Sequence, residues 1–265
     1  MTEKTRSHFG ARIAKAALFT ALAAAALTGG AAAQEACPQE AIDVATTPVP
    51  MQRSATLAKH RRLMLSINQS ADIVLFGDSL AEGWDPKLPP LNSYKVVNLG
   101  LGADTTQNAL WRLDQFEKNI LDPSIVIVLL GTNNMGAVPE SCGVAAGILA
   151  GLERVHKLWP QAHVIYFGMP PRGRFFSDFQ VPRTATNAEV AKALTERPWA
   201  EYIDVDRELT CGLVDRDTDP GRLLGALSTP LSRCGNYKSD GVHLTPRGYQ
   251  VLSDILGRDR TQTKD

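Results

Sequence analysis

The feature of this sequence that most constrains its fold is a series of short apolar runs separated by longer stretches with helical spacing. The runs are bounded by Gly, Pro, Asp or Asn and do not alternate with polar residues: Ile73 to Phe76, Val96 to Leu99, Ile125 to Leu130, Val164 to Phe167 and Tyr202 to Val205. Runs of this kind are typical of strands that are buried on both faces, as in a parallel sheet.

Helical patterns lie between the runs and after the last one. Apolar residues form stripes at helical spacing over residues 109–120, 148–159 and 252–256, and Ser54 is a plausible N-cap for an earlier helix. Strands that alternate with helices predict an α/β protein, built as a three-layer α/β/α sandwich around about five parallel strands.

The N-terminus has the pattern of a cleaved secretory signal. Four basic residues precede an apolar run over 16–27, which small residues follow up to position 33. This run is shorter than the roughly 20 residues that a membrane span needs. We expect a signal at 1–33, a leader and helix at 34–71, one domain at 72–258 and a tail at 259–265. The mature protein is expected to be secreted or periplasmic, without integral membrane contact.

Four cysteines follow the predicted signal, which favours two disulfides in an oxidising compartment. We favour Cys211–Cys234, which would close a loop over 209–240, and Cys37–Cys142 by elimination. No Cys-x-x-Cys motif occurs and no His lies at ligand spacing, so we expect no metal. Lys plus Arg and Asp plus Glu both number 28, and this balance gives no reason to expect a nucleic-acid partner.

Reactive side chains follow the predicted strands, where ligands bind in open α/β sheets. Ser79 comes after the first run, and it is either the cap of a Ser-x-x-Glu box or a nucleophile that needs a base. His243 lies in a glycine-bounded loop with Asp240 three residues before it, so that Asp240 can orient the imidazole as a general base. His60 and His156 lie among basic residues on helical patterns and are expected to be solvated.

Two further loops carry candidate hydrogen-bond donors. Asn133 after the third run is either a turn residue or an amide that stabilises an oxyanion. In the loop after the second run, Asp104 with Gln107 at cap spacing is expected to begin the next helix, which would leave the Gly102 and Ala103 amides near the cleft. That loop lacks the third Gly of a dinucleotide fingerprint, so we expect no NAD.

The four segments together resemble the signature blocks of the SGNH (GDSL) hydrolase family over roughly residues 72–256. These are Gly77-Asp78-Ser79-Leu80, the glycine loop before Asp104-Thr105, Gly131-Thr132-Asn133 and Asp240-x-x-His243. Residues 98–113 and 171–173 look especially like the catalytic subunits of platelet-activating-factor acetylhydrolase and their bacterial relatives. The resemblance implies the flavodoxin-like fold of that family and no cofactor.

The resemblance also implies roles for matching positions. Ser79 would be the nucleophile, His243 the base and Asp240 its orienter. The oxyanion donors would be the Ser79 and Ala103 amides and the Asn133 side chain. The family usually has Gly at position 103, and Ala can replace it if its φ is negative. The residues expected to contact substrate are Gly102, Asn134 and Arg172.

These residues predict an exported serine esterase that acts on short-chain esters, O-acetyl esters above all, with a small-molecule, glycan or lipid ester as substrate. An O-acyltransferase that acts on carbohydrate and a lysophospholipase-type lipid esterase remain alternatives. The segment over 171–183 carries Phe and Arg and either lines the alcohol side of the cleft or packs on the core. The sequence does not indicate the oligomeric state.

Overall fold

A computed structural model describes residues 36–116, 121–138, 140–213 and 234–262. The predicted signal at 1–33 lies outside the described residues. So do residues 214–233, which make up most of the predicted 209–240 loop, and residues 263–265 of the predicted tail.

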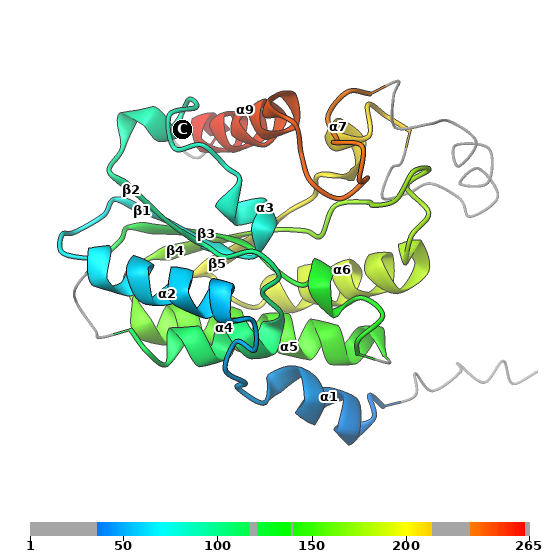
Figure 1. The fold of residues 1–265 in the computed structure, drawn as a ribbon. Helices are drawn as coiled ribbons and strands as arrows, with labels where there is room; N and C mark the ends of the chain where they lie inside the picture. The colour runs from blue at the N-terminus through cyan, green and yellow to red at the C-terminus, as the bar shows by residue number, and fades with distance from the viewer. Residues whose placement is uncertain (1–35, 117–120, 139, 214–233, 263–265) are drawn as a thin grey trace, which may run out of the picture. The chain divides into compact units, whose positions relative to one another are not determined.

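Five parallel strands form one sheet, as the sequence predicts (Figure 1). Their order is β2-β1-β3-β4-β5, and every neighbouring pair is parallel. This is the strand order of a flavodoxin-like fold. The second strand is added on one side of β1, and β3, β4 and β5 are added on the other side, so the order of the strands reverses between β1 and β3. The strands are β1 (Ile73–Gly77), β2 (Val96–Gly100), β3 (Ile125–Leu129), β4 (His163–Phe167) and β5 (Ala200–Ile203).

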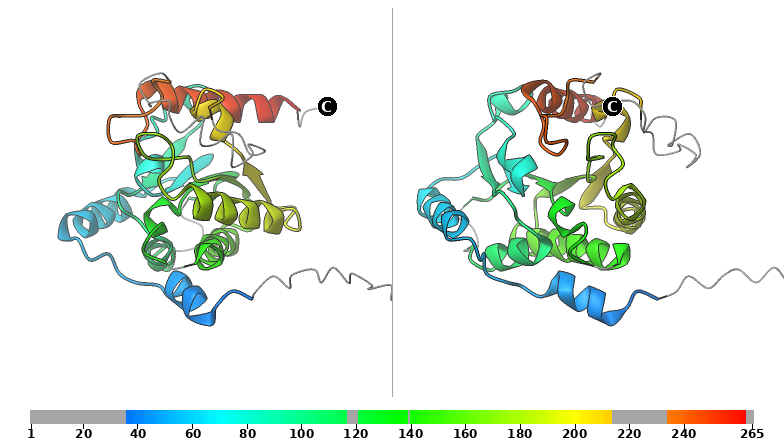
Figure 2. Two further views of the ribbon diagram at one scale, coloured as in Figure 1. Left: turned by 90° about the vertical axis from the view of Figure 1, so that its right-hand side faces the viewer. Right: turned by 45° about the vertical axis from the view of Figure 1, so that its right-hand side comes forward.

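Helices cover both faces of the sheet, which gives the predicted three layers (Figure 2). Three helices pack on one face: α4 (Thr106–Leu113), α5 (Ser141–Leu158) and α6 (Gln180–Leu194). On the outer side of α5 lies α1 (Gln39–Thr46). The other face carries α3 (Ser79–Glu82), α7 (Asp206–Leu209) and α9 (Pro246–Gln262). Near the β2 edge lies α2 (Ser54–Ser66).

The burial of β1 shows why its sequence has no polar alternation. Val74 and Phe76 contribute to the core on the α5 side, whereas Ile73 and Leu75 contribute to the core on the α9 side. All four side chains have no exposed surface. Because both faces are covered, both sets of alternate residues must be apolar.

Several elements differ from the expectation. The sequence pattern did not predict α1 or α6, and the predicted run Tyr202 to Val205 begins and ends two residues after β5. Since α6 begins at Gln180, the end of the predicted 171–183 loop is helical. Ser54 is the first residue of α2 rather than its cap. The last helix continues to Gln262, past the predicted domain end at 258.

Both expected disulfides are present, Cys37–Cys142 and Cys211–Cys234. The first ties the segment before α1 to α5. Within the described ranges, no helix is long and apolar enough to cross a membrane.

Candidate active site

Four segments meet at the carboxyl edge of the sheet. Three of them follow β1, β2 and β3, and the fourth, residues 234–245, precedes α9. The strand order reverses between β1 and β3, and in flavodoxin-like sheets the ligand cleft lies outside the carboxyl ends of the strands at this point. The fold therefore brings together segments that are up to 164 residues apart in sequence.

Ser79 is the first residue of α3, and Asp78 before it is the helix cap. The Asp78 carboxylate accepts a hydrogen bond from the N–H of Leu80 at 2.8 Å. The interpretation of Ser79 as the cap of a Ser-x-x-Glu box is therefore wrong. Asp78 is fully buried, and burial raises its pKa to about 7, although the bond from Leu80 opposes the rise. The half-buried Ser79 hydroxyl is therefore not used as the cap of α3.

Gly77 is required at the end of β1 because its backbone lies against β3. Its φ is +137°, and a Cβ at this position would lie 1.8 Å from the carbonyl oxygen of Leu129. Only glycine fits such a close approach. This contact fixes the turn that carries Ser79 against the strand that leads to Asn133.

His243 joins Ser79 to Asp240. Its Nε2 lies 2.9 Å from Ser79 Oγ, and its Nδ1 lies 2.8 Å from Asp240 Oδ2. The other carboxylate oxygen of Asp240 accepts the N–H groups of Val242 and His243, each at 2.9 Å. Partial burial alone would raise the pKa of Asp240, but these two N–H groups and the imidazole lower it to about 2. Asp240 is therefore an anion at neutral pH, and it holds the ring with Nε2 toward the serine.

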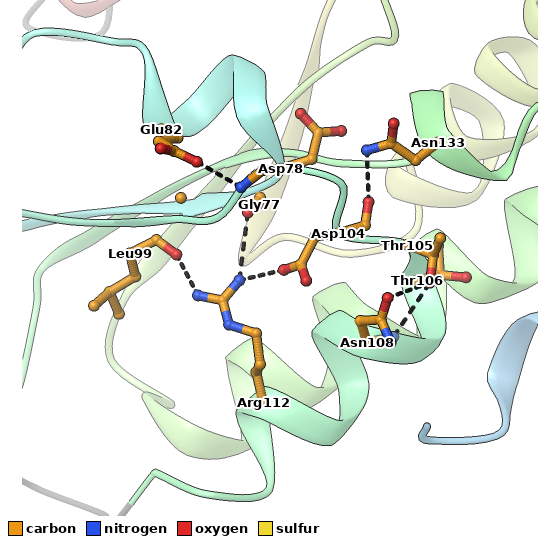
Figure 3. Close-up of polar contacts among 12 residues, drawn as sticks. Gly77, Asp78, Glu82, Leu99, Asp104, Thr105, Thr106, Asn108, Arg112 and Asn133 are labelled. Carbon is orange, nitrogen blue, oxygen red and sulfur yellow. Dashed lines mark hydrogen bonds and ion pairs between the residues drawn. The ribbon is translucent and has the colours of Figure 1, made fainter. Parts of the chain in front are cut away.

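Three N–H donors lie in the segments around Ser79. Among the described residues, no acceptor takes the backbone N–H of Ser79 or of Ala103. Asn133 Nδ2 donates one hydrogen to the carbonyl of Asp104 at 2.8 Å, which leaves its second hydrogen available (Figure 3). Ala103 has a φ of +65°, so the condition set for alanine in place of the family's glycine, a negative φ, is not met. The loop holds alanine in the left-handed region, a conformation that glycine adopts more readily.

A buried arginine holds the loop after β2. The guanidinium of Arg112, which has no exposed surface, donates to the Asp104 carboxylate, to the carbonyl of Leu99 and to that of Gly77 at 3.4 Å (Figure 3). Burial raises the pKa of Asp104, and Arg112 opposes that rise. The helix therefore does not begin at Asp104 as expected. Thr105 caps it, by accepting from the N–H of Asn108.

Glu82 holds the same loop from the other side. Its Oε2 accepts the N–H of Gly102 at 2.5 Å, and its carboxylate also pairs with Lys59 of α2. The Gly102 amide, which we expected to face substrate, is therefore already bonded within the protein. Gly102 therefore stays a candidate only for lining the substrate cleft, not for donating its N–H to a substrate.

Asn134 is a buried residue whose side chain holds the start of α4. It has no exposed surface, and its side chain bonds to the backbone N–H and hydroxyl of Thr106 and to Gln107. It therefore fixes the start of α4, and the expectation that it contacts substrate is wrong.

Arg172 supports the turn that carries Asn133. Its Nη1 donates to the carbonyl of Thr132 at 3.0 Å, and its guanidinium lies over the exposed ring of Phe179. Of the other residues in the 171–183 segment, Phe176 is buried and Arg183 forms a buried ion pair with Asp206. The interpretation that this segment packs on the core therefore holds for part of it, and its place on the alcohol side of the cleft stays a prediction.

The sequence reading missed Arg112 and Glu82 as residues that shape the site. Arg112 lies one helical turn from Ala109 and next to Leu113, on the apolar stripe of the predicted helix. A basic residue on such a stripe is a sequence signal for a buried, paired charge. No comparable signal marks Glu82. The prediction that His60 is solvated is wrong, because His60 is buried against Trp111, and burial lowers its pKa to about 4. His156 stacks on Trp199.

Among the described residues, no group of three or more His, Cys, Asp or Glu side chains is arranged to hold a metal ion. The chemistry that the arrangement can perform is nucleophilic attack by a serine hydroxyl, with an imidazole to take its proton and N–H groups to receive a negative oxygen.

Comparison with known proteins gives one family and several relatives. The model of the GDSL-like lipase/acylhydrolase family matches residues 75–251. The alpha1 subunit of platelet-activating factor acetylhydrolase IB from Rattus norvegicus is 36% identical over 153 residues, which are 56% of this chain and 64% of that protein. The match thus spans less than two thirds of that relative's length. The alpha2 subunit from the same organism is 30% identical over 207 residues, 76% of this chain and 81% of that protein.

The fold has also been solved in other proteins. The crystal structure of a member of the lipolytic protein G-D-S-L family from Veillonella parvula matches with a TM-score of 0.51 at 15% identity, over 71% of this chain and 97% of that one. At this identity the likeness concerns the fold alone.

Proposed function

Since this chain belongs to the GDSL-like lipase/acylhydrolase family, we propose that it is an exported serine esterase that hydrolyses short-chain carboxylic esters, O-acetyl esters above all. The observation that carries the proposal is the chain of hydrogen bonds from Ser79 through His243 to Asp240 at the carboxyl edge of the sheet. A serine hydroxyl alone is a weak nucleophile, and a base within hydrogen-bond distance activates it.

In the first half of the reaction, Ser79 Oγ attacks the ester carbonyl carbon while His243 Nε2 takes the hydroxyl proton. The carbonyl oxygen becomes an anion, which the N–H groups of Ser79 and Ala103 and the free hydrogen of Asn133 Nδ2 stabilise. The tetrahedral carbon then releases the alcohol, whose oxygen takes the proton from His243. The acyl group remains on Ser79.

In the second half, water replaces the alcohol. His243 takes a proton from the water as the hydroxide oxygen bonds to the acyl carbon, and the bond from that carbon to Ser79 Oγ breaks. The proton returns to Ser79, and the carboxylic acid leaves. Asp240, an anion with a pKa of about 2, stabilises the imidazolium at both stages.

The preference for a short acyl chain rests on Ala103. Its methyl group lies beside the amide that we assign to the oxyanion site, so it reduces the space next to the acyl carbon. The relatives named as acetylhydrolases agree with a small acyl group. One methylene changes binding in an apolar pocket by about 1–3 kcal/mol, so we propose a preference for acetyl over hexanoyl of roughly 10-fold or more rather than an absolute one.

Export is supported by the two disulfides, since disulfides persist in oxidising compartments. The N-terminal pattern of a secretory signal agrees with it.

A hydrolysis panel on the protein without residues 1–33 tests the proposal. The substrates are p-nitrophenyl esters from acetyl to octanoyl, acetylated xylan and a lysophospholipid. We expect hydrolysis of the acetyl esters with the highest kcat/KM. Values that rose steadily toward octanoyl would contradict the short-chain preference, and acyl transfer to an added sugar in place of release of acetate would indicate the transferase. No turnover of any ester would contradict the esterase itself.

A further inference from the structure

The buried guanidinium of Arg112 joins the two strands that lead into the site (Figure 3). Its Nη1 donates to the carbonyl of Gly77 at the end of β1, at 3.4 Å, and its Nη2 donates to the carbonyl of Leu99 in β2. The same Nη1 pairs with the carboxylate of Asp104. One side chain of α4 therefore holds the turn that leads to Ser79 and both ends of the loop after β2.

Asp104 connects Arg112 to the other two oxyanion donors. It directly follows Ala103, and its carbonyl accepts a hydrogen bond from Asn133 Nδ2 at 2.8 Å. The carboxylate that Arg112 holds and the carbonyl that Asn133 contacts belong to the same residue, so a shift of Asp104 moves both donors. The assignment of these donors, and with it the inference below, rests on the proposed function.

The backbone of Ala103 needs to be held in place. Its φ of +65° lies in a region that alanine adopts less readily than glycine. On one side of it, the N–H of Gly102 is bonded to Glu82, and on the other side the carboxylate of Asp104 is bonded to Arg112. Without Arg112, the loop can relax toward an ordinary backbone conformation, which turns the Ala103 N–H away from Ser79.

We propose that Arg112 is a positioning residue for the reaction, which keeps the N–H groups of Ser79, Ala103 and Asn133 directed at one point. Arg112 has no exposed surface, so it does not contact a substrate and acts only through these donors. An oxyanion donor acts mainly in the transition state, and a small misplacement of it can cost up to about 100-fold in rate. Loss of Arg112 therefore lowers kcat and leaves KM nearly unchanged, whereas a purely structural role would leave kcat per folded molecule unchanged.

Arg112→Lys separates the two roles. Lysine keeps a positive charge beside Asp104, but it lacks the planar fork with which arginine donates to acceptors in different directions. We expect kcat for p-nitrophenyl acetate, per folded molecule, to fall by about 10–100-fold, with KM within about 3-fold of wild type. Circular dichroism and thermal unfolding give the folded fraction at the temperature of the assay.

The matched control is Arg183→Lys in α6. Arg183 is also buried, and it also pairs with a carboxylate, that of Asp206, and donates to a carbonyl, that of Met169 at 2.6 Å. Neither partner lies in a segment that carries an oxyanion donor. This variant changes a buried ion pair in the same way, and its kcat per folded molecule should stay within about 2-fold of wild type.

A trifluoromethyl ketone inhibitor gives the second readout. Ser79 Oγ adds reversibly to its carbonyl carbon while His243 takes the proton, and the carbonyl oxygen becomes an anion where the oxyanion of the reaction forms. The inhibition constant should rise in Arg112→Lys by about the factor by which kcat/KM falls. It should stay within about 2-fold of wild type in Arg183→Lys.

If Arg112→Lys does not fold, Asp104→Asn replaces it, with Asp206→Asn as its control. The amide keeps an oxygen that can accept from Arg112 but removes the charge of the pair. The same pattern is expected, with a lower kcat, a nearly unchanged KM and weaker binding of the ketone in Asp104→Asn alone.

A folded site variant with kcat within 2-fold of wild type would overturn the proposal. So would equal falls of kcat in the variant and its control, or a lower kcat with an unchanged inhibition constant. If wild type neither hydrolyses p-nitrophenyl acetate nor binds the ketone, the proposed function itself is wrong.

Discussion

His243 Nε2 lies 2.9 Å from Ser79 Oγ, although 164 residues separate the two in sequence. If this contact activates the hydroxyl, His243→Ala should lower kcat for p-nitrophenyl acetate by about 10⁴-fold or more, because nucleophile and base act as a unit. Steady-state kinetics with circular dichroism of the folded variant checks this. A residual kcat of a tenth of wild type would contradict it.

The matched control for that variant is His163→Ala. His163 lies at the start of β4, at the opposite end of the sheet from the site, and its half-exposed ring is 3.4 Å from Glu201. Its loss should change kcat by less than about 2-fold.

Asn133→Ala should lower kcat by about 10²–10³-fold with little change in KM, since an oxyanion donor acts mainly in the transition state. The carbonyl of Asp104 also loses a hydrogen bond in this variant, so thermal unfolding should be measured beside the kinetics. A rise in KM with unchanged kcat would make Asn133 a substrate-binding or turn residue instead.

Arg112→Met should lower the free energy of unfolding by about 3–5 kcal/mol, because it leaves the buried Asp104 carboxylate without its partner. Urea unfolding measures the loss. Arg154→Met is the comparison, since the Arg154–Asp114 pair is more than a third exposed, and exposed pairs contribute about 1 kcal/mol or less. Equal losses would show that burial of the Arg112–Asp104 pair does not matter.

Asp78 gives the protein a pH dependence that a single variant removes. The pKa of its carboxyl is raised from 3.8 to about 7 in the fold, so between about pH 4 and pH 7 the unfolded chain has released a proton that the folded chain still holds. The stability associated with Asp78 is therefore present in acid and is lost as the pH rises through this window.

Asp78→Asn keeps an oxygen that can accept the Leu80 N–H but does not ionise. The midpoint of thermal unfolding, followed from pH 4 to pH 8, should therefore fall less in the variant than in wild type. Parallel curves would contradict the raised pKa of Asp78.

The strands were predictable because burial on both faces leaves continuous apolar runs in the sequence, whereas their order did not follow from the residues and was implied only by the family resemblance. Helix α6 was missed because polar residues such as Arg183, Thr186 and Asn187 are buried in it through specific bonds, which a search for apolar spacing does not detect. The predicted bounds of β5 were shifted for a different reason. Glu201 and Tyr202 are only half-buried at the sheet edge, so the strand does not form a continuous apolar run.

Ser79 and Asn133 were predicted from their places after strands, and Asp240 and His243 from their spacing in a loop before the last helix. The resemblance to the family added their roles, and the family assignment is confirmed. The two cysteine pairings are also present in the structure. The parts that failed are those that depend on backbone conformation or on long-range side-chain bonds. The φ of Ala103, the burial of Asn134 and the pairing of Asp104 with Arg112 arise only when the loops have packed together.

The most direct test is to identify the residue to which a serine-directed reagent attaches. The protein is treated with a fluorophosphonate and digested, and the modified peptide is identified by mass spectrometry. We predict one adduct, on Ser79, which is absent from Ser79→Ala and forms far more slowly in His243→Ala because the hydroxyl is no longer activated. An adduct on a different residue, or equal labelling of the Ser79→Ala protein, would contradict the assignment of Ser79 as the nucleophile.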